Sequence, residues 1–251
     1  MNKQISHYNR IIESYDETYF DDLSVRYREE FFFKPLFSSI SLAGKSLLEI
    51  GCGSGLNIKY LSEKYPDLTL YGCDISNTAI LRFQKNNPGH SCFVADITGQ
   101  DFGFRISVDI CLGIGILHHC VRNLRKAFEN IYDILSPDGV LMLIEPNGSG
   151  WINFIRNLWY RYDKKYFDSE NEKAFGVDEV LNIAMDLFSV ETIKYFGGPA
   201  YFLVLNSLIF RCTKSLKSLL FPALMFSERR MNYFSGKHIS PLYTLRLKKK
   251  G

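Results

Sequence analysis

A glycine-rich turn carries the clearest chemical signal in this sequence. It follows an apolar run, residues 47–50, that is typical of a buried strand. Its alternating glycines are Gly51, Gly53 and Gly55. Glycine has no Cβ and tolerates positive φ, so such a turn lets backbone approach a ligand closely, usually a nucleotide-like cofactor. The dinucleotide fingerprint needs a small residue where Leu56 stands, which disfavours NAD. Glu49 would repel a pyrophosphate but suits a ligand with an amino group or hydroxyls.

Several motifs between residues 40 and 147 resemble those of the class I S-adenosylmethionine (SAM) dependent methyltransferases. The segment Glu49–Gly55 is similar to the family's first motif, an acid followed by alternating glycines. The further motifs are, in order, Tyr71–Ser76, Phe93–Ile97, Val108–Gly113, Leu117–His119 and Ser136–Gly139, the last as a turn before a fifth strand, Val140–Ile144. Ordered motifs are more specific than one glycine loop. The alternative is an unrelated doubly wound sheet that keeps its glycine turn for packing.

The resemblance implies SAM as the cofactor and assigns residues to it. The acid at the end of the second strand, Asp74, would hold the ribose hydroxyls, and Ile75 would lie against adenine. Asp96 would bond the adenine amino group. The full predicted cofactor set is Glu49, Gly51, Cys52, Gly53, Gly55, Asp74, Ile75, Asp96, Ile97, Gly113, Tyr15 and Arg26. No metal ligand is predicted.

Methyl transfer also needs an aligned acceptor and, for an alcohol or an acidic carbon, a base. A sulfonium methyl is already activated, so proximity and exclusion of water supply much of the catalysis. His118 and His119 follow the fourth strand, at the carboxyl edge where open α/β sheets bind ligands, and neutral imidazole accepts a proton near neutral pH. We predict them as candidate catalytic residues. In the alternative, one histidine packs or caps the loop and the other faces solvent.

Three further residues are predicted to bind the acceptor. Glu145 and Asn147 follow the fifth strand at the same edge, although Pro146 equally indicates a plain strand exit. Tyr201 begins a strongly apolar run nearer the carboxyl end.

These residues require strands and helices in a set order. The resemblance implies an α/β, doubly wound Rossmann-like sheet of seven strands whose last strand is antiparallel. Two helical patterns precede the sheet, one with Tyr8, Tyr15 and Tyr19 and one over about residues 23–40. The resemblance makes them a lid that touches the cofactor through Tyr8, Tyr15 and Arg26, while core packing alone is the alternative.

With 251 residues, 46% of them hydrophobic and 23% charged, the chain suits one α/β domain. Its predicted parts are N-terminal helices (1–43), a cofactor-binding core (44–147), substrate-side helices and a strand (148–198), a helical insertion (199–239), and a final strand with a basic tail (240–251). Within them we predict helices over 151–162 and 176–187 and strands over 190–196 and 242–247.

The insertion is both apolar and basic. Its apolar runs, 201–210 and 219–226, are too short to span a bilayer. Residues 199–251 hold ten Lys and Arg against one acid, Glu228, within a chain of net charge +3. One interpretation is a lid in which Tyr201, Leu205 and Leu208 line the substrate pocket. Another is an amphipathic helix on an anionic membrane surface, with Arg211, Lys214 and Lys217 toward headgroups. A third is a solvated basic face.

Composition adds an expected location. The six cysteines lack the paired spacing of a zinc site or a disulfide framework, and the first 22 residues contain no apolar signal segment. We therefore expect a cytoplasmic protein, or one peripheral at the inner face of a membrane.

Three functions are compatible with these features. The leading hypothesis is a SAM-dependent methyltransferase for a small apolar or lipid-linked acceptor, modified at oxygen or activated carbon. The basic carboxyl region suggests an RNA methyltransferase, but no RNA-binding module is recognisable, so nucleic acid is not the expected partner. A non-catalytic SAM-fold binding protein is disfavoured because the motif acids and glycines are intact.

Overall fold

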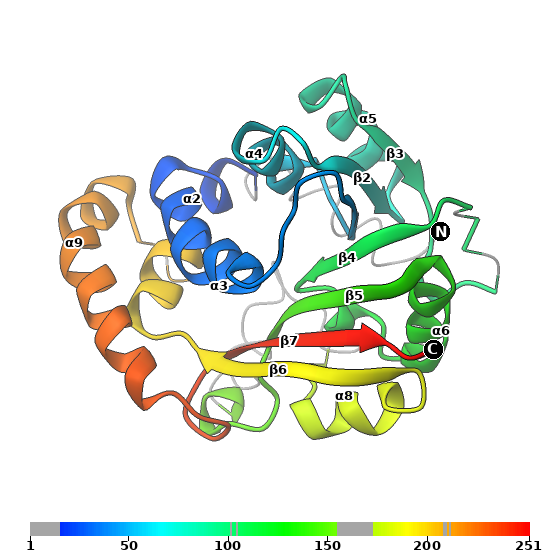
Figure 1. The fold of residues 1–251 in the computed structure, drawn as a ribbon. Coiled ribbons are helices and arrows are strands. Elements are labelled where there is room, and N and C mark those ends of the chain that lie inside the picture. Colours follow the sequence, from blue (N-terminus) through cyan, green and yellow to red (C-terminus); the bar gives the residue numbers. More distant parts are fainter. Residues whose placement is uncertain (1–15, 101, 104, 155–172, 208–209, 211) are drawn as a thin grey trace.

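The computed structural model describes residues 16–100, 102–103, 105–154, 173–207, 210 and 212–251. Seven strands of this part of the chain form one sheet (Figure 1). They are β1 (Ser46–Ile50), β2 (Thr69–Asp74), β3 (Ser91–Val94), β4 (Val108–Ile114), β5 (Leu135–Pro146), β6 (Phe188–Phe196) and β7 (Leu242–Lys249). Their order is β3-β2-β1-β4-β5-β7-β6, and β7 runs antiparallel to both neighbours while the other pairs are parallel. The predicted fold class is confirmed.

Helices cover both faces of the sheet because successive strand residues point to opposite sides. In β1, Leu47 packs under the N-terminal helices, α4 (Leu56–Lys64) and α5 (Asn77–Asn86). Its neighbour Leu48 packs against α6 (Leu124–Ile134) and α8 (Val177–Ala184) on the other face. Both leucines are fully buried, as a parallel sheet covered on two sides requires.

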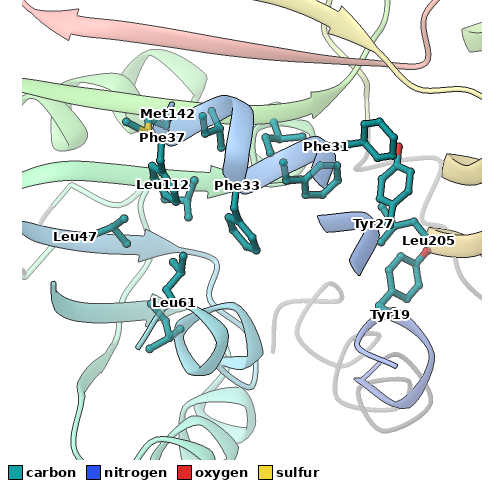
Figure 2. Packing of buried hydrophobic residues seen from close by; sticks show 14 of the residues in the cluster. Tyr19, Tyr27, Phe31, Phe33, Phe37, Leu47, Leu61, Leu112, Met142 and Leu205 are labelled. Atoms are coloured by element: carbon teal, nitrogen blue, oxygen red, sulfur yellow. The ribbon is translucent and has the colours of Figure 1, made fainter. Parts of the chain in front are cut away.

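The N-terminal helices form one continuous segment over the sheet. It consists of α2 (Asp22–Arg28), a π-helical turn η1 (Glu29–Phe33) and α3 (Lys34–Phe37), which confirms the helix expected over about 23–40. Asp21 caps its start by accepting a hydrogen bond from the Ser24 N–H at 2.8 Å. Figure 2 shows Phe33 and Phe37 over the sheet residues Leu47, Leu112 and Met142, while Tyr27 and Phe31 extend toward Leu205. The segment thus bridges the sheet and the insertion.

The predicted turn before the fifth strand is instead a bulge within β5. Val108 of β4 pairs with Leu135, and Ile110 pairs with Val140, so four residues of β5 stand opposite one of β4. Asp138, in the bulge, has a φ of 62°. The left-handed conformation favoured by asparagine and aspartate lets the extra residues loop out while pairing resumes on both sides.

The insertion is helical, as expected. It contains η3 (Tyr201–Leu205, π-helical), α9 (Lys214–Met231) and η4 (Asn232–Phe234). In Figure 1 α9 forms the outer edge of the molecule, beyond α2. Among the described helices, none combines the length and apolar character needed to cross a membrane. The expected elements 176–187, 190–196 and 242–247 correspond to α8, β6 and β7, whereas most of the helix expected over 151–162 lies outside the described residues.

Lys217 corrects the sequence-based interpretation of the insertion. In the membrane interpretation it would face anionic headgroups with Arg211 and Lys214, but its side chain is 1% exposed. The ammonium donates to both carboxylate oxygens of Asp21, at 2.7 and 2.8 Å, and to the Ser24 hydroxyl at 2.8 Å. Lys217 therefore fixes α9 to the start of α2. Arg211 lies outside the described residues.

A second buried polar link joins the same two helices. Glu228 of α9 is fully buried and accepts the hydroxyl proton of Tyr27 at 2.7 Å. It also accepts the N–H groups of Gly198 and Ala200, each at 2.9 Å, and of Tyr201 at 3.4 Å. These N–H groups would otherwise be unpaired at the start of η3. Burial raises the pKa of Glu228, against the lowering effect of these donors.

Candidate active site

The glycine turn connects β1 to α4, and its three glycines have different roles. All three have left-handed backbone, with φ of 67° at Gly51, 54° at Gly53 and 77° at Gly55. A Cβ on Gly51 would lie 2.6 Å from Ile116, and one on Gly55 would lie 2.4 Å from Phe83. At Gly53 a Cβ would meet no atom within 4 Å. Two glycines therefore permit close packing, while Gly53 borders open space where a ligand can meet backbone.

Asp74 reaches this turn from the carboxyl end of the neighbouring strand β2. Its Oδ2 accepts the Gly53 N–H at 3.0 Å, and its Oδ1 accepts the Ser76 N–H at 2.8 Å. Burial raises the pKa of Asp74, although these backbone donors act in the opposite direction. The structure thus places two residues of the predicted cofactor set, 21 positions apart, in direct contact. The following residue, Ile75, is half-buried at the same edge.

Glu49 is a buried acid with one oxygen unused. The residue is 2% exposed, and its Oε1 accepts a hydrogen bond from the Asn57 amide at 2.6 Å. Its Oε2 is buried without a hydrogen-bond partner among the described residues. Burial raises the pKa of Glu49 to about 8. An unsatisfied carboxylate oxygen beside a glycine turn indicates a place for a hydrogen-bond donor or a cation.

The N-terminal helices supply a cation to this network, but through a different arginine from the predicted one. Arg28 is 5% exposed and donates to the Asn57 side-chain oxygen at 3.4 Å. The predicted Arg26 is exposed and lies over the Phe221 ring, 4.8 Å from its centre, on α9. Two positions along a helix turn the side chain by about 200°, so the two arginines point to opposite sides. The sequence alone does not distinguish Arg28 from Arg26, because the choice depends on which face of the helix is buried.

A further contact ties the N-terminal segment to the turn. The Ser54 hydroxyl, inside the glycine turn, donates to Asp16 at 2.8 Å. The segment therefore lies over the carboxyl edge, as a lid would. The lid residues Tyr8 and Tyr15 lie outside the described part of the chain, so their contact with a cofactor stays a prediction.

The other members of the predicted cofactor set lie after β3, in β4 and in the glycine turn. Asp96 is exposed, and its Oδ1 accepts the Thr98 N–H at 2.8 Å and the Thr98 hydroxyl at 2.7 Å. Ile97 is buried on the α6 side of the sheet. Gly113 has no room for a side chain, since a Cβ would lie 2.7 Å from Ile116. Cys52 is buried, and burial raises the pKa of its thiol, so only its backbone suits a ligand contact.

His118 and Glu145 form a hydrogen-bonded pair across the ends of β4 and β5. His118 Nδ1 lies 3.2 Å from Glu145 Oε2, and the Glu145 side chain is 2% exposed. Glu145 Oε1 accepts the N–H groups of Ile116 and Leu117, at 2.7 and 2.8 Å. Because the carboxylate accepts, it holds the imidazole proton on Nδ1 and leaves the lone pair on Nε2. His119 lies beside it, with ring centres 3.9 Å apart.

The acceptor-binding role predicted for Glu145 and Asn147 finds no support in this geometry. The oxygens of Glu145 serve the loop after β4 and the His118 ring. Asn147 is 1% exposed, and its amide donates to the carbonyl oxygens of Lys237 and Ser240 at 2.7 and 2.8 Å. Its side-chain oxygen accepts the Ser149 N–H at 3.0 Å. Both side chains hold backbone groups in place. Two isolated polar residues after a strand do not reveal this role in the sequence.

Tyr201 is the first residue of η3, which follows β6 at the same edge of the sheet. It is half-buried, and its ring packs on Phe202 with ring centres 5.0 Å apart. Leu205 is buried near Tyr27, and Leu208 lies outside the described residues. A role of Tyr201 in acceptor binding stays a prediction.

One surface hollow lies away from these residues. It has a volume of about 420 Å³ and is lined by parts of α5, β3 and the segment near Phe102. None of the predicted cofactor, catalytic or acceptor residues lines it. The chemistry-bearing residues gather instead at the carboxyl ends of β1, β2, β4 and β5.

Comparison with known proteins agrees with this arrangement. Residues 48–141 match the family model described as a methyltransferase domain. This stretch is a methyltransferase domain. It contains the glycine turn, Asp74, Asp96 and the two histidines, so most of the predicted site lies inside the matched region.

The relatives of this methyltransferase domain differ in what they act on. The human tRNA N(3)-cytidine methyltransferase METTL2B is 31% identical over 113 residues, which cover 41% of this chain and 30% of that protein. The chain thus spans less than a third of the length of that relative. The mycolic acid cyclopropane synthase CmaA1, solved with SAH and CTAB, has a TM-score of 0.69 at 16% identity, covering 98% of this chain and 96% of its own. The N-methyltransferase NodS from Bradyrhizobium japonicum WM9, solved with SAH, has a TM-score of 0.57 at 15% identity, covering 96% and 98%. These two structures show the shared class I fold.

Proposed function

We propose that this protein is a SAM-dependent methyltransferase that acts on a small apolar or lipid-linked acceptor, at oxygen or activated carbon. The observation that carries the proposal is the Oε2 of buried Glu49, which has no hydrogen-bond partner in the described part of the chain, beside the open position at Gly53. The methyltransferase domain match over residues 48–141 supports the reaction class.

The residues present suit SAM as the ligand. Glu49 Oε2 has no hydrogen-bond donor among the described residues. The ammonium group of SAM could donate a hydrogen bond to it and would also supply a positive charge. Asp74, already hydrogen-bonded to the turn, has the acceptor chemistry that ribose hydroxyls need. Gly53 lets the ligand approach backbone, and the half-buried Ile75 offers apolar surface for a flat base. The buried Arg28, near Glu49, adds a positive charge that suits a carboxylate.

The chain's own residues then have three tasks at the carboxyl edge. When bound, SAM supplies a methyl group that is already activated by a sulfonium centre. The protein must hold the acceptor in line and keep water out, which the N-terminal helices favour by lying over the edge. His118 accepts the proton that an alcohol or an acidic carbon must lose. Glu145 keeps the His118 proton on Nδ1 and stabilises the imidazolium that forms.

The apolar character of the acceptor is supported by the lid and by one relative. Aromatic and aliphatic side chains of the N-terminal segment and η3 pack together above the sheet. The structurally similar CmaA1 is a mycolic acid cyclopropane synthase, an enzyme named for a lipid. The tRNA methyltransferase resembles only 41% of this chain, so it supports the domain rather than RNA as the substrate.

Mass spectrometry after incubation with isotope-labelled SAM tests the acceptor class. Lipid extract, soluble metabolites and RNA from the source cell are offered in parallel. A labelled small molecule or lipid supports the proposal. Label in RNA alone overturns the acceptor class, and the absence of any labelled product from a protein that binds SAM supports a binding protein instead.

The base is tested by two neighbouring substitutions. His118→Gln should lower kcat by about 10²- to 10⁴-fold, the usual contribution of general acid–base catalysis, while SAM affinity is kept. His119→Gln is made in parallel, and the hydrogen bond between His118 Nδ1 and Glu145 Oε2 leads us to expect the larger loss from His118→Gln. Equal activity of His118→Gln and the unaltered protein would remove His118 from the mechanism.

A further inference from the structure

One side of α9 exposes a row of apolar side chains. The row continues into η4 and is called here the outer α9 face. Its members are Leu216, Leu219, Ala223 and Phe226 of α9 and Tyr233 and Phe234 of η4. Leu219 is 76% exposed, Tyr233 82% and Phe234 78%. Single exposed apolar residues are ordinary, but a row at alternating spacings of three and four marks one helix face.

The opposite side of α9 shows why this row cannot turn inward. Phe221, Leu224 and Met225 are buried there against the N-terminal helices and η3. Lys217 near the start of α9 and Glu228 near its end are fixed to α2 by the buried links to Asp21 and Tyr27. Rotating the helix would break both links and leave two charges buried without partners. The exposure of the outer α9 face is therefore a fixed property of the fold.

Charge is distributed to suit an anionic surface. Glu228 is the only acid between Pro199 and Gly251, and it is fully buried. The insertion thus presents no carboxylate to solvent. Arg230 is exposed within the row, between Phe226 and Tyr233, and its guanidinium lies over the Phe226 ring, 5.2 Å from its centre. Arg229 is directed to the other side, where it pairs with Glu30 of the N-terminal segment.

We propose that the outer α9 face docks on the surface of an anionic lipid bilayer. The apolar and aromatic side chains enter the boundary between headgroups and acyl chains, and Arg230 contacts the headgroups. The inference rests on the proposed function, because a lipid-linked acceptor has to reach the carboxyl edge of the sheet. Through its links to α2 and η3, docking of α9 would hold that edge beside the bilayer.

Sedimentation with lipid vesicles tests the proposal on the full-length chain. Vesicles of phosphatidylcholine with phosphatidylglycerol are compared with vesicles of phosphatidylcholine alone, at low and high salt. We expect binding to the anionic vesicles that weakens with salt. The variant Arg230→Glu should bind at least about ten-fold more weakly, because it changes the charge by two units and each unit near such a surface contributes on the order of a factor of five. The double variant Leu219→Ser, Phe226→Ser should lose binding at both salt concentrations.

Matched variants separate this face from general effects of charge or exposure. Lys85→Glu makes the same charge change at an exposed position of α5. Leu81→Ser with Met185→Ser removes exposed apolar side chains of α5 and of the end of α8. Both controls should sediment as the unaltered protein does. Equal loss in the controls would overturn the assignment to α9.

Two other measurements keep the outcomes distinct. Calorimetric SAM titration of each variant reports the proposed function separately, so a protein that binds SAM but never sediments overturns only the membrane inference. Light scattering on a sizing column reports self-association. A dimer that Leu219→Ser, Phe226→Ser dissociates, without vesicle binding, would show that a second copy covers the face and would overturn the bilayer as its partner.

Discussion

Two buried glutamates, one in the methyltransferase domain and one in the insertion, differ in how fully they are satisfied. Among the residues that the structure describes, Asn57 donates to one oxygen of Glu49 and nothing pairs with the other. Glu228 accepts one hydroxyl and three backbone N–H groups. Burial raises the pKa of both. Since a buried polar group costs free energy unless it is paired, the unfinished pairing at Glu49 indicates a ligand, while the complete pairing at Glu228 indicates a structural connection.

The comparison extends to the surroundings of each acid. Glu49 lies beside a turn in which Gly53 borders open space. Glu228 lies among closed packing between α9, η3 and the N-terminal segment. Substitutions near Glu49 should therefore change binding more than stability, and substitutions at Glu228 should do the reverse.

The largest effect is expected at Gly53. Gly53→Val should abolish SAM binding because the new side chain fills the open space at the turn, while the circular dichroism spectrum is kept. Gly44→Val is the matched control: Gly44 also has positive φ, and a Cβ there also meets no atom within 4 Å, but it precedes β1 at the opposite edge. Normal calorimetric binding by Gly53→Val would make the turn purely structural.

Removing the Glu228 side chain should cause the largest loss of stability. Glu228→Ala leaves the Tyr27 hydroxyl and the Gly198 and Ala200 N–H groups without an acceptor, and each such group costs about 1–3 kcal/mol. We expect the free energy of unfolding, measured with urea, to fall by about 3 kcal/mol or more. The exposed Glu63→Ala should change it by less than about 0.5 kcal/mol. A Glu228→Ala protein as stable as that control would refute the structural link.

A smaller effect on binding is expected at Asp74. Two hydrogen bonds from ribose hydroxyls to a carboxylate are each worth about 1.5–3 kcal/mol. Asp74→Ala should weaken SAM binding at least about ten-fold in a calorimetric titration. Part of the loss would come from the Gly53 N–H, which also loses its acceptor. Asp74→Asn, which keeps one carbonyl oxygen, should lose less, and unchanged affinity in both variants would reject the ribose assignment.

The smallest effect is a pH dependence at Glu49. Burial raises the pKa of Glu49 to about 8, so without ligand the folded protein holds this proton below that pH. A ligand ammonium favours the carboxylate, so SAM affinity should rise toward about pH 8, by at most about ten-fold per pH unit. Glu49→Gln should bind more weakly and lose this slope. Calorimetry in buffers of different ionisation enthalpy detects the released proton, and its absence would contradict the role of Glu49.

The same proton also affects the stability of the fold. Stability should fall as the pH rises, whereas SAM affinity should increase. The folded-state pKa of Glu49 is raised above its ordinary value, so the unfolded chain releases the proton first. The ligand-free protein should lose stability between the ordinary carboxyl range and about pH 8, by at most about 1.4 kcal/mol per pH unit from this group. Urea unfolding of Glu49→Gln, in which this contribution is absent, provides the comparison.

The fold and the cofactor motifs could be predicted because they depend on local patterns. Apolar runs followed by glycines or by an acid predict strands that end at one sheet edge, and β1, β2 and β4 confirm this. The helical nature of residues 199–239 followed from composition and spacing in the same way. The bulge in β5 could not be predicted, because Ser136–Gly139 has the residue types of an ordinary turn. Its place within β5 is shown by the pairing with β4.

The roles of individual charged residues depended on which elements pack together. Amino-acid order alone determined that a strand with an acid near its end is followed by three glycines and a helix, and that the carboxyl fifth of the chain is basic. It could not determine that Arg28 rather than Arg26 faces Asn57, that Lys217 turns inward to Asp21, or that Glu145 serves His118. The partners in each case are 27 to 196 positions apart in the chain. Local patterns record the periodicity of one element, whereas the free energy of a buried charge is set by the neighbours that the tertiary structure brings to it.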